Sequence, residues 1–519
     1  MNAAPTLLTV ALSLPFAPSA LGQVEVRLQP ADPAAFGNFG ISVAVDAERG
    51  VVGATGAATG GVTSGAAYVY DPSTGQQTMR LNVTDAESGG FGSAVALDGG
   101  RIYVGAPFRS DIGATPADFI TRAGGVYVFD ATSGAQLDFL LPSDAVPHAN
   151  FARSLAVEGG LMAVGARAAT APGVEPDAVY VFDALTGQEL HKLFASDGAD
   201  EDGLGREVAI DGGLVLSGAA GDDDSGNRSG SAYVFDAVTS VELAKLTASD
   251  AAAGDAFGTS VAIEGNRAVV GAPRNEDNGP SSGSVYVFDA RSGQELMKLV
   301  PADGLTGDTF GEAVAIEGGR ILVGAPQSDE LADRSGSVYV FDLATGAQLA
   351  KFTASDGGET HFFGSCLAAQ RDVVAVGAPF ADGSEPSEGA AYLFDLDGGP
   401  DGVVSYCEPT TPNAVSTTGA LLTSTGGFGT SNATFNVSAV PNNFGLLFGG
   451  DAQTSVVLGC GTRCVGGAIV RGPIEMAVNN QVLGATFDMA TFGSTDVQYW
   501  FRDAGSCGAG SNLSNALTR

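Results

Sequence analysis

Acidic side chains gather in three equivalent segments near the middle of this 519-residue chain. Carboxylates at this density suit Ca²⁺, which takes about six to eight oxygen ligands. Calcium is therefore the candidate cofactor. The spacing of the acids matches no standard calcium loop, so solvated turns are the alternative. The candidate metal ligands are Asp222, Asp223, Asp224, Glu276, Asp277, Asp329 and Glu330.

Signals for catalysis are weak. The three histidines, His148, His191 and His361, fall in different parts of the chain, and no motif ties any of them to a nucleophile or a metal. The sequence has no P-loop, no HExxH and no GxSxG elbow after a strand. We assign no catalytic residue and expect a protein that is not an enzyme.

The acids are positioned by a repeat with a period of about 53 residues, and such a period is typical of propellers and solenoids. Each copy opens on Phe or Leu followed by Gly or Ala, has the Gly of a GAP-like triplet 14 residues later, and ends in a YVFD-like run. The first landmark stands at Phe39, Phe91, Phe151, Leu204, Phe257, Phe310 and Phe363. The glycines are Gly53, Gly105, Gly165, Gly218, Gly271, Gly324 and Gly377.

Each copy holds four strand-like runs, which in the fifth copy are residues 259–263, 267–271, 284–289 and 295–300. Short links between the first and second runs, and between the third and fourth, suit tight hairpins. Four-stranded antiparallel sheets around an axis form a β-propeller, so seven copies predict an all-β, seven-bladed propeller. Residues 23–28 match a fourth run, which the seventh copy lacks, and are expected to close the last blade. The longer links lie on the opposite face, where we expect binding.

An Asp precedes the first landmark by seven residues in six copies and by six residues, at Asp85, in the other. Equivalent positions in every copy cannot all belong to one active site. We expect a structural role, with the carboxylates accepting backbone N–H groups in Asx-type turns. The six residues are Asp32, Asp144, Asp197, Asp250, Asp303 and Asp356.

Residues 1–22 predict a cleaved secretory signal, because they are apolar in the middle and end in small residues. We therefore expect a secreted or otherwise extracytoplasmic protein. No later segment has the roughly 18 consecutive apolar residues that a membrane span requires.

The net charge is −35, of which −32 falls outside residues 399–519. This charge argues against nucleic acid and anionic membranes as partners, since both need a basic surface.

Residues 399–519 are expected to form a second, β-sandwich-like domain, with strand-like runs at 433–440, 454–458 and 497–502. In a secreted chain an even set of cysteines predicts two disulfides, and three pairings are open. Zinc is the alternative. Cys366, in the seventh copy, is expected to be a buried and inert thiol. The disulfide candidates are Cys407, Cys460, Cys464 and Cys507.

The FG, GAP and YVFD landmarks, as in GAAGDDDSGNRSGSAYVFD at residues 218–236, resemble the FG-GAP repeats of secreted bacterial proteins and of the integrin α propeller. The resemblance covers residues 23–395 and implies a seven-bladed adhesion propeller. Integrin-type blades often hold a calcium cage between the first two strands, but here that link is as short as residues 264–266. Those calcium sites are not carried over.

The expected function is non-enzymatic binding or adhesion, in which an acidic propeller face is presented to a protein or glycan ligand. Ca²⁺ is a candidate cofactor for this binding. The alternative is an extracellular polysaccharide hydrolase or lyase that uses carboxylates at the propeller axis. A surface-layer protein is a third class. Residues 182–190 and 341–349 also look similar to quinoprotein dehydrogenase repeats, which place a Trp after this hairpin. The single Trp, Trp500, lies outside the repeats.

Overall fold

The computed structural model describes residues 22–59, 62–83, 89–110, 122–166, 177–199 and 201–398, together with the backbone of seven strands between residues 421 and 502. All regular secondary structure in these residues is β, so this part of the chain has no helix that could span a membrane. The chain divides into two compact units, residues 1–402 and 403–519. The predicted signal segment, residues 1–22, lies outside the described residues apart from Gly22.

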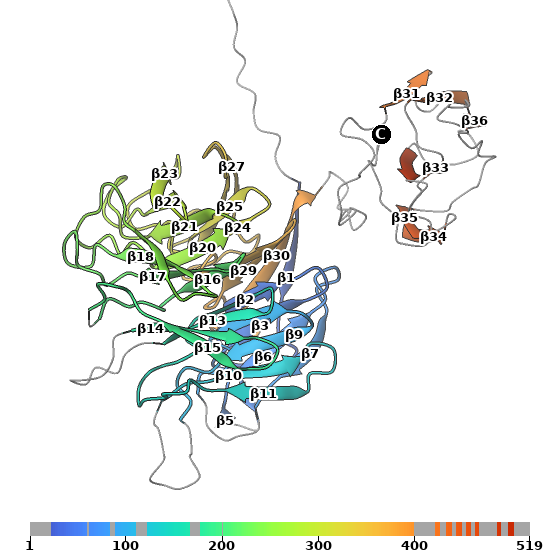
Figure 1. Ribbon diagram of the computed structural model, residues 1–519. Helices are drawn as coiled ribbons and strands as arrows, with labels where there is room; N and C mark the ends of the chain where they lie inside the picture. The colour runs from blue at the N-terminus through green and yellow to red at the C-terminus, as the bar shows by residue number, and fades with distance from the viewer. Residues whose placement is uncertain are drawn as a thin grey trace, which may run out of the picture. The chain divides into compact units, whose positions relative to one another are not determined.

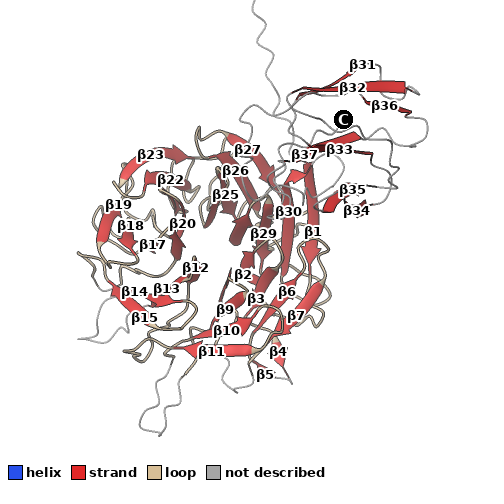
Figure 2. Cartoon of the chain, turned by 45° about the vertical axis from the view of Figure 1, so that its right-hand side comes forward, coloured by secondary structure: helices blue, strands red, loops and turns tan. Residues whose placement is uncertain are grey.

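The first unit is a ring of seven four-stranded antiparallel sheets, as predicted (Figures 1 and 2). Blade 1 contains β2 (Phe39–Val45), β3 (Gly50–Ala54), β6 (Ala66–Tyr70) and β7 (Gln77–Leu81), and a small hairpin, β4 (Ala58–Thr59) with β5 (Val62–Thr63), projects from it. Blade 2 contains β8 (Ala94–Asp98), β9 (Arg101–Gly105), β10 (Val126–Asp130) and β11 (Gln136–Leu140). Blade 3 contains β12 (Leu155–Glu158), β13 (Leu161–Ala166), β14 (Ala178–Asp183) and β15 (Glu189–Leu193).

The next three blades have the same strand order. Blade 4 contains β16 (Val208–Asp211), β17 (Leu214–Ala219), β18 (Ser231–Asp236) and β19 (Glu242–Leu246). Blade 5 contains β20 (Ser260–Glu264), β21 (Arg267–Ala272), β22 (Ser284–Asp289) and β23 (Gln294–Leu299). Blade 6 contains β24 (Ala313–Glu317), β25 (Arg320–Ala325), β26 (Ser337–Asp342) and β27 (Gln348–Phe352).

Blade 7 closes the ring with both ends of the propeller sequence. It contains β28 (Cys366–Gln370), β29 (Val373–Ala378) and β30 (Ala390–Gly398), and its fourth strand is β1 (Gly22–Leu28). The pairing of β1 with β30 is antiparallel and places Glu25 opposite Phe394 and Arg27 opposite Tyr392. The prediction that residues 23–28 complete the last blade is confirmed, and β30 is thereby spared an open edge.

The third strand of each blade is apolar on both faces because it lies between two neighbouring blades. In β22, Val285, Tyr286 and Val287 are all completely buried. The landmark aromatic packs on this strand: the ring of Phe257 meets those of Tyr286 and Phe288 edge-on, with centroids 5.5 and 5.8 Å apart. Such edge-to-face pairs add to the stabilisation from burial. The FG and YVFD landmarks of one repeat therefore form one core.

The first strands form the innermost ring, each next to the first strands of the two flanking blades (Figure 2). Neighbouring blades approach so closely there that the GAP position has no room for a side chain. A Cβ on Gly271 would lie 2.1 Å from the carbonyl oxygen of Gly311 in the next blade. At all seven GAP glycines the corresponding distance is between 1.8 and 2.3 Å. The glycine is thus required by the packing of blades around the axis.

The second unit has only its strands described. They are β31 (Leu421–Thr425), β32 (Asn432–Ser438), β33 (Asn443–Phe448), β34 (Gln453–Val457), β35 (Thr462–Gly466), β36 (Ala485–Asp488) and β37 (Val497–Arg502). They form one three-stranded sheet, β31-β32-β36, and two pairs, β33-β37 and β34-β35. Cys464 falls in β35, while Cys407, Cys460 and Cys507 lie outside the described residues, so the disulfides stay a prediction.

Candidate functional site

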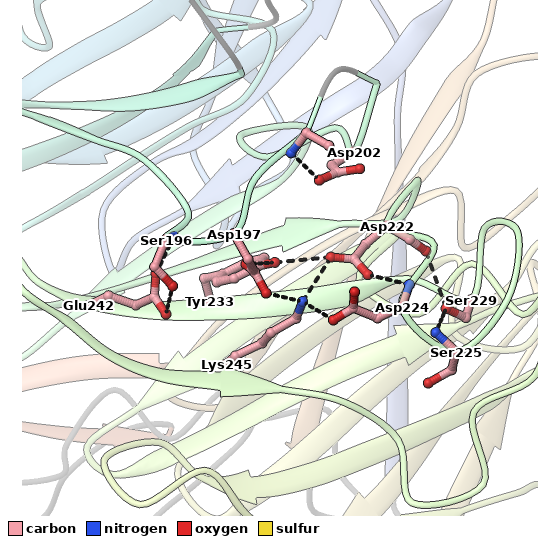
Figure 3. A network of polar contacts seen from close by, with 11 residues as sticks. Ser196, Asp197, Asp202, Asp222, Asp224, Ser225, Ser229, Tyr233, Glu242 and Lys245 are labelled. Atoms are coloured by element: carbon pink, nitrogen blue, oxygen red, sulfur yellow. Dashed lines mark hydrogen bonds and ion pairs between the residues drawn. The ribbon is translucent and has the colours of Figure 1, made fainter.

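Lysine ammonium groups lie among the carboxylates of the acidic segments. In blade 4 the Lys245 Nζ contacts carboxylate oxygens of Asp197, Asp222 and Asp224 at 2.8, 3.0 and 2.5 Å (Figure 3). The Tyr233 hydroxyl lies 2.9 and 3.0 Å from carboxylate oxygens of Asp197 and Asp222, and its single proton can be donated to either of them. Asp222 is buried, and this pairing compensates the cost of removing its charge from water. The lysine comes from the fourth strand and the acids from two loops of the long-loop face.

The same arrangement recurs in blades 5 and 6. Lys298 pairs with Asp250 at 2.6 Å and also with Asp277. Lys351 pairs with Asp303 at 2.7 Å and with Glu330 at 2.6 Å. Each acidic segment is therefore neutralised in part by the fourth strand of its own blade.

The remaining candidate metal ligands stabilise their own loops or project from them. The carboxylates of Asp223 and Asp329 accept the backbone N–H groups of Arg228 and Arg334, at 2.7 and 2.8 Å. Both arginines have positive φ, 55° and 53°, a conformation that needs such support. The side chain of Glu276 is exposed and forms no hydrogen bond or ion pair with the described residues.

The seven candidate metal ligands thus belong to three separate blades and do not form one site. Among the described residues, no group of three or more His, Cys, Asp or Glu side chains is arranged to hold a metal ion. Calcium binding stays a prediction.

The recurring Asp before each landmark has a structural role, but not the expected partners. In blade 5 the Asp250 carboxylate accepts the Tyr286 hydroxyl at 2.8 Å and the Lys298 ammonium at 2.6 Å. Burial opposes ionisation, yet these two bonds lower the pKa of Asp250. The backbone caps come from another acid, since Asp255 accepts the N–H of Ala252 at 2.9 Å. Asp85 lies outside the described residues.

The three histidines do not come together in one site, since His148 and His191 belong to blade 3 and His361 to blade 7. His148 is in the loop that leads into blade 3, His191 is in β15, and His361 is in the loop that leads into blade 7. The His361 Nδ1 accepts the N–H of Gly358 at 2.9 Å, and burial lowers the pKa of this imidazole. His361 therefore stabilises its own loop.

A group of charged residues that the repeat analysis missed lies at the axial end of the long-loop face. The second and third residues after each landmark begin the innermost strand, and in most blades they are small or uncharged. Ser260 shows the usual role of the third residue, since its hydroxyl donates at 2.7 Å to the carbonyl of Gly311 in the next blade. Blades 3, 4 and 6 carry charges there instead, and a loop of blade 5 adds one more. We call this set the axial cluster: Arg153, Arg206, Glu207, Arg274 and Glu312.

The charges of the axial cluster affect the pKa values of its glutamates across neighbouring blades. Burial raises the pKa of Glu207 to about 7, against the opposing effect of Arg206 and Arg153. Burial likewise raises the pKa of Glu312, which Arg206 and Arg274 oppose. Both glutamates reach solvent, yet the crowded strand starts around them exclude enough water to disfavour their charged forms.

The charge of Glu207 in the axial cluster also affects the pKa of a thiol in blade 7. Burial raises the pKa of the Cys366 thiol in blade 7 to about 12, and the charge of Glu207 in blade 4 adds to the shift. Cys366 and Glu207 occupy the same position of the repeat, the third residue after the landmark, in blades 7 and 4. Cys366 is a free thiol, and its Sγ takes the place of the Ser260 hydroxyl by donating to the Gly40 carbonyl at 3.2 Å.

Four members of the axial cluster have charged groups that form no hydrogen bond with the described residues. In the described part of the chain, no hydrogen bond or ion pair reaches the charged ends of Arg206, Glu207, Arg274 or Glu312. Desolvated charges without such partners are typical of binding and active sites.

Exposed phenylalanines occupy the same face over blades 7, 1 and 2. Phe36, Phe108 and Phe380 are 69%, 40% and 44% exposed and come from three different loops. The half-buried ring of Phe362 packs edge-on against Phe380, with centroids 5.5 Å apart. Phe362 has a φ of 55°, which is a strained conformation for a bulky residue. The long-loop face thus has an aromatic part and, in blades 3 to 6, a charged part.

Sequence comparison agrees with this architecture. A profile described as FG-GAP repeat matches six segments, residues 23–70, 136–182, 188–235, 241–288, 294–341 and 347–394, which together exceed half of the chain. The chain belongs to the FG-GAP repeat family. Each matched FG-GAP segment begins on the fourth strand of one blade and ends on the third strand of the next, so the first match starts on the closing strand β1.

The second copy of the repeat, which forms blade 2, is not matched by the profile between residues 71 and 135. Its longer link between β9 and β10 accounts for the weaker similarity, and the structure nevertheless gives it the same four strands. The fold is therefore an integrin α-like FG-GAP propeller of the general binding or adhesion type. A comparison with curated proteins finds no significant match.

Proposed function

We propose that this protein is a secreted, non-enzymatic binding or adhesion protein that holds a protein or glycan ligand on its long-loop face. The observation that carries the proposal is the axial cluster. Charged side chains with unused hydrogen-bonding capacity gather where all seven blades meet, although most equivalent positions hold small or uncharged residues. A stability requirement would not select charges at this place, because desolvating them is costly.

The aromatic part of the face supports the same proposal. Exposed Phe36, Phe108 and Phe380 offer apolar contact area beside the charged groups, and aromatic and Arg side chains together dominate the energetics of many interfaces. A rigid propeller that presents loops is also a suitable scaffold for binding.

The test is a binding screen with the chain from residue 23 onward, immobilised and exposed to extracellular glycans and matrix proteins. The proposal predicts that Arg206→Ala weakens capture of any ligand found. The matched control is Arg291→Ala, since Arg291 is an exposed arginine on the opposite, hairpin face. Equal loss of capture in both variants, or a ligand that depends on neither face, would contradict the proposal.

One observation favours a second candidate, a polysaccharide hydrolase or lyase. Glu207 and Glu312 are two axial carboxyl groups with raised pKa values, and a raised pKa suits a general acid. The test is release of reducing ends from soluble polysaccharides. Turnover that disappears in both Glu207→Gln and Glu312→Gln would establish an enzyme, and its absence with retained binding would leave the binding protein.

A further inference from the structure

Resting on the proposed binding function, we propose that the axial cluster is a subsite for the carboxylate of an acidic sugar within a short extracellular oligosaccharide. The contributing groups are the guanidinium groups of Arg206 and Arg274, the carboxyl groups of Glu207 and Glu312, and the aromatic side chains of the neighbouring blades.

The charge of the cluster is opposite to that of the whole chain. It contains three arginines and two glutamates, whereas the chain has 24 basic and 59 acidic residues and a net charge of −35. Elsewhere on this face the acids are paired with lysines such as Lys245 and Lys298. The axis is therefore a part of the long-loop face where guanidinium groups without a protein partner, those of Arg206 and Arg274, are available to an anionic group.

The donors fit a carboxylate in particular. A guanidinium presents a planar fork that binds a carboxylate through two parallel hydrogen bonds, and neither Arg206 nor Arg274 has such a partner among the described residues. Arg206 precedes the innermost strand of blade 4, and Arg274 follows the second strand of blade 5 on the same long-loop face. We therefore expect a ligand carboxylate bound at the axis to meet one or both of these guanidinium groups.

The glutamates supply the acceptors that the rest of an acidic sugar requires. Sugar hydroxyls are donors, and carboxylates that lack other partners accept them readily. A ligand with only anionic groups, such as a polyphosphate, would leave Glu207 and Glu312 facing further negative charge. Arginines interleaved with glutamates thus favour a carboxylate surrounded by hydroxyl groups.

The aromatic part of the face extends the site beyond one sugar. The apolar face of a sugar ring packs well on an aromatic side chain, and Phe380 and Phe108 are exposed on the blades next to the charged part. The half-buried ring of Phe362 packs edge-on against Phe380 and extends this aromatic surface. We expect neighbouring sugars to rest on these rings.

Binding of an anionic ligand should depend on pH through Glu207. The charged and titratable groups that face it are Arg206 on its own strand, Arg153 in blade 3 and the protonated Cys366 thiol in blade 7. Of these, only the Glu207 carboxyl titrates near neutral pH. Its protonation removes a negative charge beside the bound carboxylate, so affinity should rise as pH falls from 8 to 5.

The experiment is calorimetric titration of the full chain with defined trisaccharides of galacturonate, glucuronate and mannuronate, each compared with its methyl ester. Esterification removes the charge and retains the sugar. We expect at least one acid form to bind about tenfold or more tightly than its ester, since hydrogen bonds to charged groups are individually strong. Arg206→Ala and Arg274→Ala should each weaken binding of the acid form to a similar extent, and Arg291→Ala should leave its affinity unchanged. Glu207→Gln should reduce the dependence of the affinity on pH between 5 and 8, and additional replacement of Glu312, whose pKa burial also raises, should reduce it further.

The outcomes separate this inference from the function on which it rests. Equal affinity for acid and ester would overturn carboxylate binding and leave glycan binding intact. If no trisaccharide binds while a protein ligand is captured in an Arg206-dependent manner, the acidic sugar is wrong and the binding face stands. If no ligand of either class depends on Arg206, both proposals fail.

Discussion

Arg27 of the closing strand forms an ion pair with Asp356 of the loop that leads into blade 7, and their nearest nitrogen and oxygen lie 2.7 Å apart. This contact is equivalent to the ion pair of Lys298 and Asp250 in blade 5, where the ammonium nitrogen and the carboxylate oxygen lie 2.6 Å apart. Tyr392 donates to Asp356 as Tyr286 donates to Asp250. The two ends of the propeller sequence thus meet through the contacts that join consecutive blades.

The closing strand should depend on its side chains more than other fourth strands do. Glu25 accepts the Ser355 N–H and hydroxyl, and Arg27 binds Asp356. No hairpin tethers β1 to β30, so these bonds, the strand ladder and the packing of Val26 and Leu28 retain it. We expect replacement of Glu25 and Arg27 by Ala to accelerate hydrogen exchange of the β30 amides about tenfold, equivalent to about 1.4 kcal/mol of local stability.

The matched control for the closing strand is the pair Glu295→Ala and Lys298→Ala in blade 5. These residues make the equivalent contacts with Ser249 and Asp250, but a tight hairpin joins β23 to β22. Exchange of the β22 amides should rise much less. Equal acceleration in the two blades would show that the side chains, and not chain continuity, dominate.

Gly271→Ala should destabilise the propeller through a collision between blades. The new methyl group would lie 2.1 Å from the Gly311 carbonyl oxygen and 2.3 Å from the Ser260 Oγ. Overpacking of this kind costs roughly 1–3 kcal/mol, measurable as a lower urea midpoint. Gly50→Ala is the control, since a Cβ there meets nothing within 4 Å. A neutral Gly271→Ala would mean that the blades can separate at the axis.

Lys245→Met should be more harmful than Lys351→Met. Lys245 contacts three carboxylates, including buried Asp222, whereas Lys351 contacts Asp303 and Glu330, and Ser328 stands at the position equivalent to Asp222. Loss of one partner of a largely buried ion pair costs about 3 kcal/mol or more. We expect a larger fall in the urea midpoint for Lys245→Met, and equal falls would contradict the role of Asp222.

The same variant tests calcium binding. With the ammonium removed, Asp197, Asp222 and Asp224 are left as oxygen ligands without their counter-ion. A metal bound only by the folded state raises the melting temperature. Millimolar Ca²⁺ should therefore raise the melting temperature of Lys245→Met more than that of the unmodified chain, each relative to EDTA at constant ionic strength. A larger rise in the unmodified chain would place calcium elsewhere.

The repeat was sufficient to predict the fold because the residues that repeat are those that pack. The Phe257 and Tyr286 positions form the same aromatic contact in six blades, and Leu204 takes the place of the Phe in blade 4. The Gly271 position lies against the next blade in all seven, so the spacing of these residues defines the strands and the number of blades. The lysines were missed as partners of the acids because they follow by about twenty residues along the chain, on the fourth strand. Sequence proximity therefore favoured a metal site where the folded chain places Lys245.

The axial cluster could not be predicted from the repeat. Arg206, Glu207 and Glu312 depart from the pattern of their own positions, and alignment of the copies treats such departures as variation. Their common location follows only when the first strands converge on the axis. A useful signal in the sequence was the charge at the second and third residues after the landmark, in copies three, four and six.

Glu207→Gln should stabilise the protein at alkaline pH. Burial raises the pKa of Glu207 to about 7 in the folded state, against about 4.3 in an unfolded chain. Between these values the folded state binds more protons than the unfolded state, so the free energy of unfolding falls as pH rises. Glutamine does not ionise, so the variant does not lose this stability as pH rises. The variant should be more stable than the unmodified chain at pH 8, by on the order of 1 kcal/mol because solvent screens the exposed carboxylate, and the difference should vanish near pH 4.

The sign of the effect distinguishes Glu207 from an ordinary loop acid. Glu312, whose pKa burial also raises, should give the same trend in Glu312→Gln. Asp236 should give the opposite trend, because hydrogen bonds from Thr239 lower its pKa and its contribution to stability is lost as pH falls below about 4. Urea unfolding of Glu207→Gln, Glu312→Gln and Asp236→Asn at pH 3, 4, 6 and 8 measures both trends. If Glu207→Gln lost stability at pH 8, the ion pairing of Glu207 with Arg206 and Arg153 would outweigh its desolvation, and the axial cluster would be a structural salt bridge.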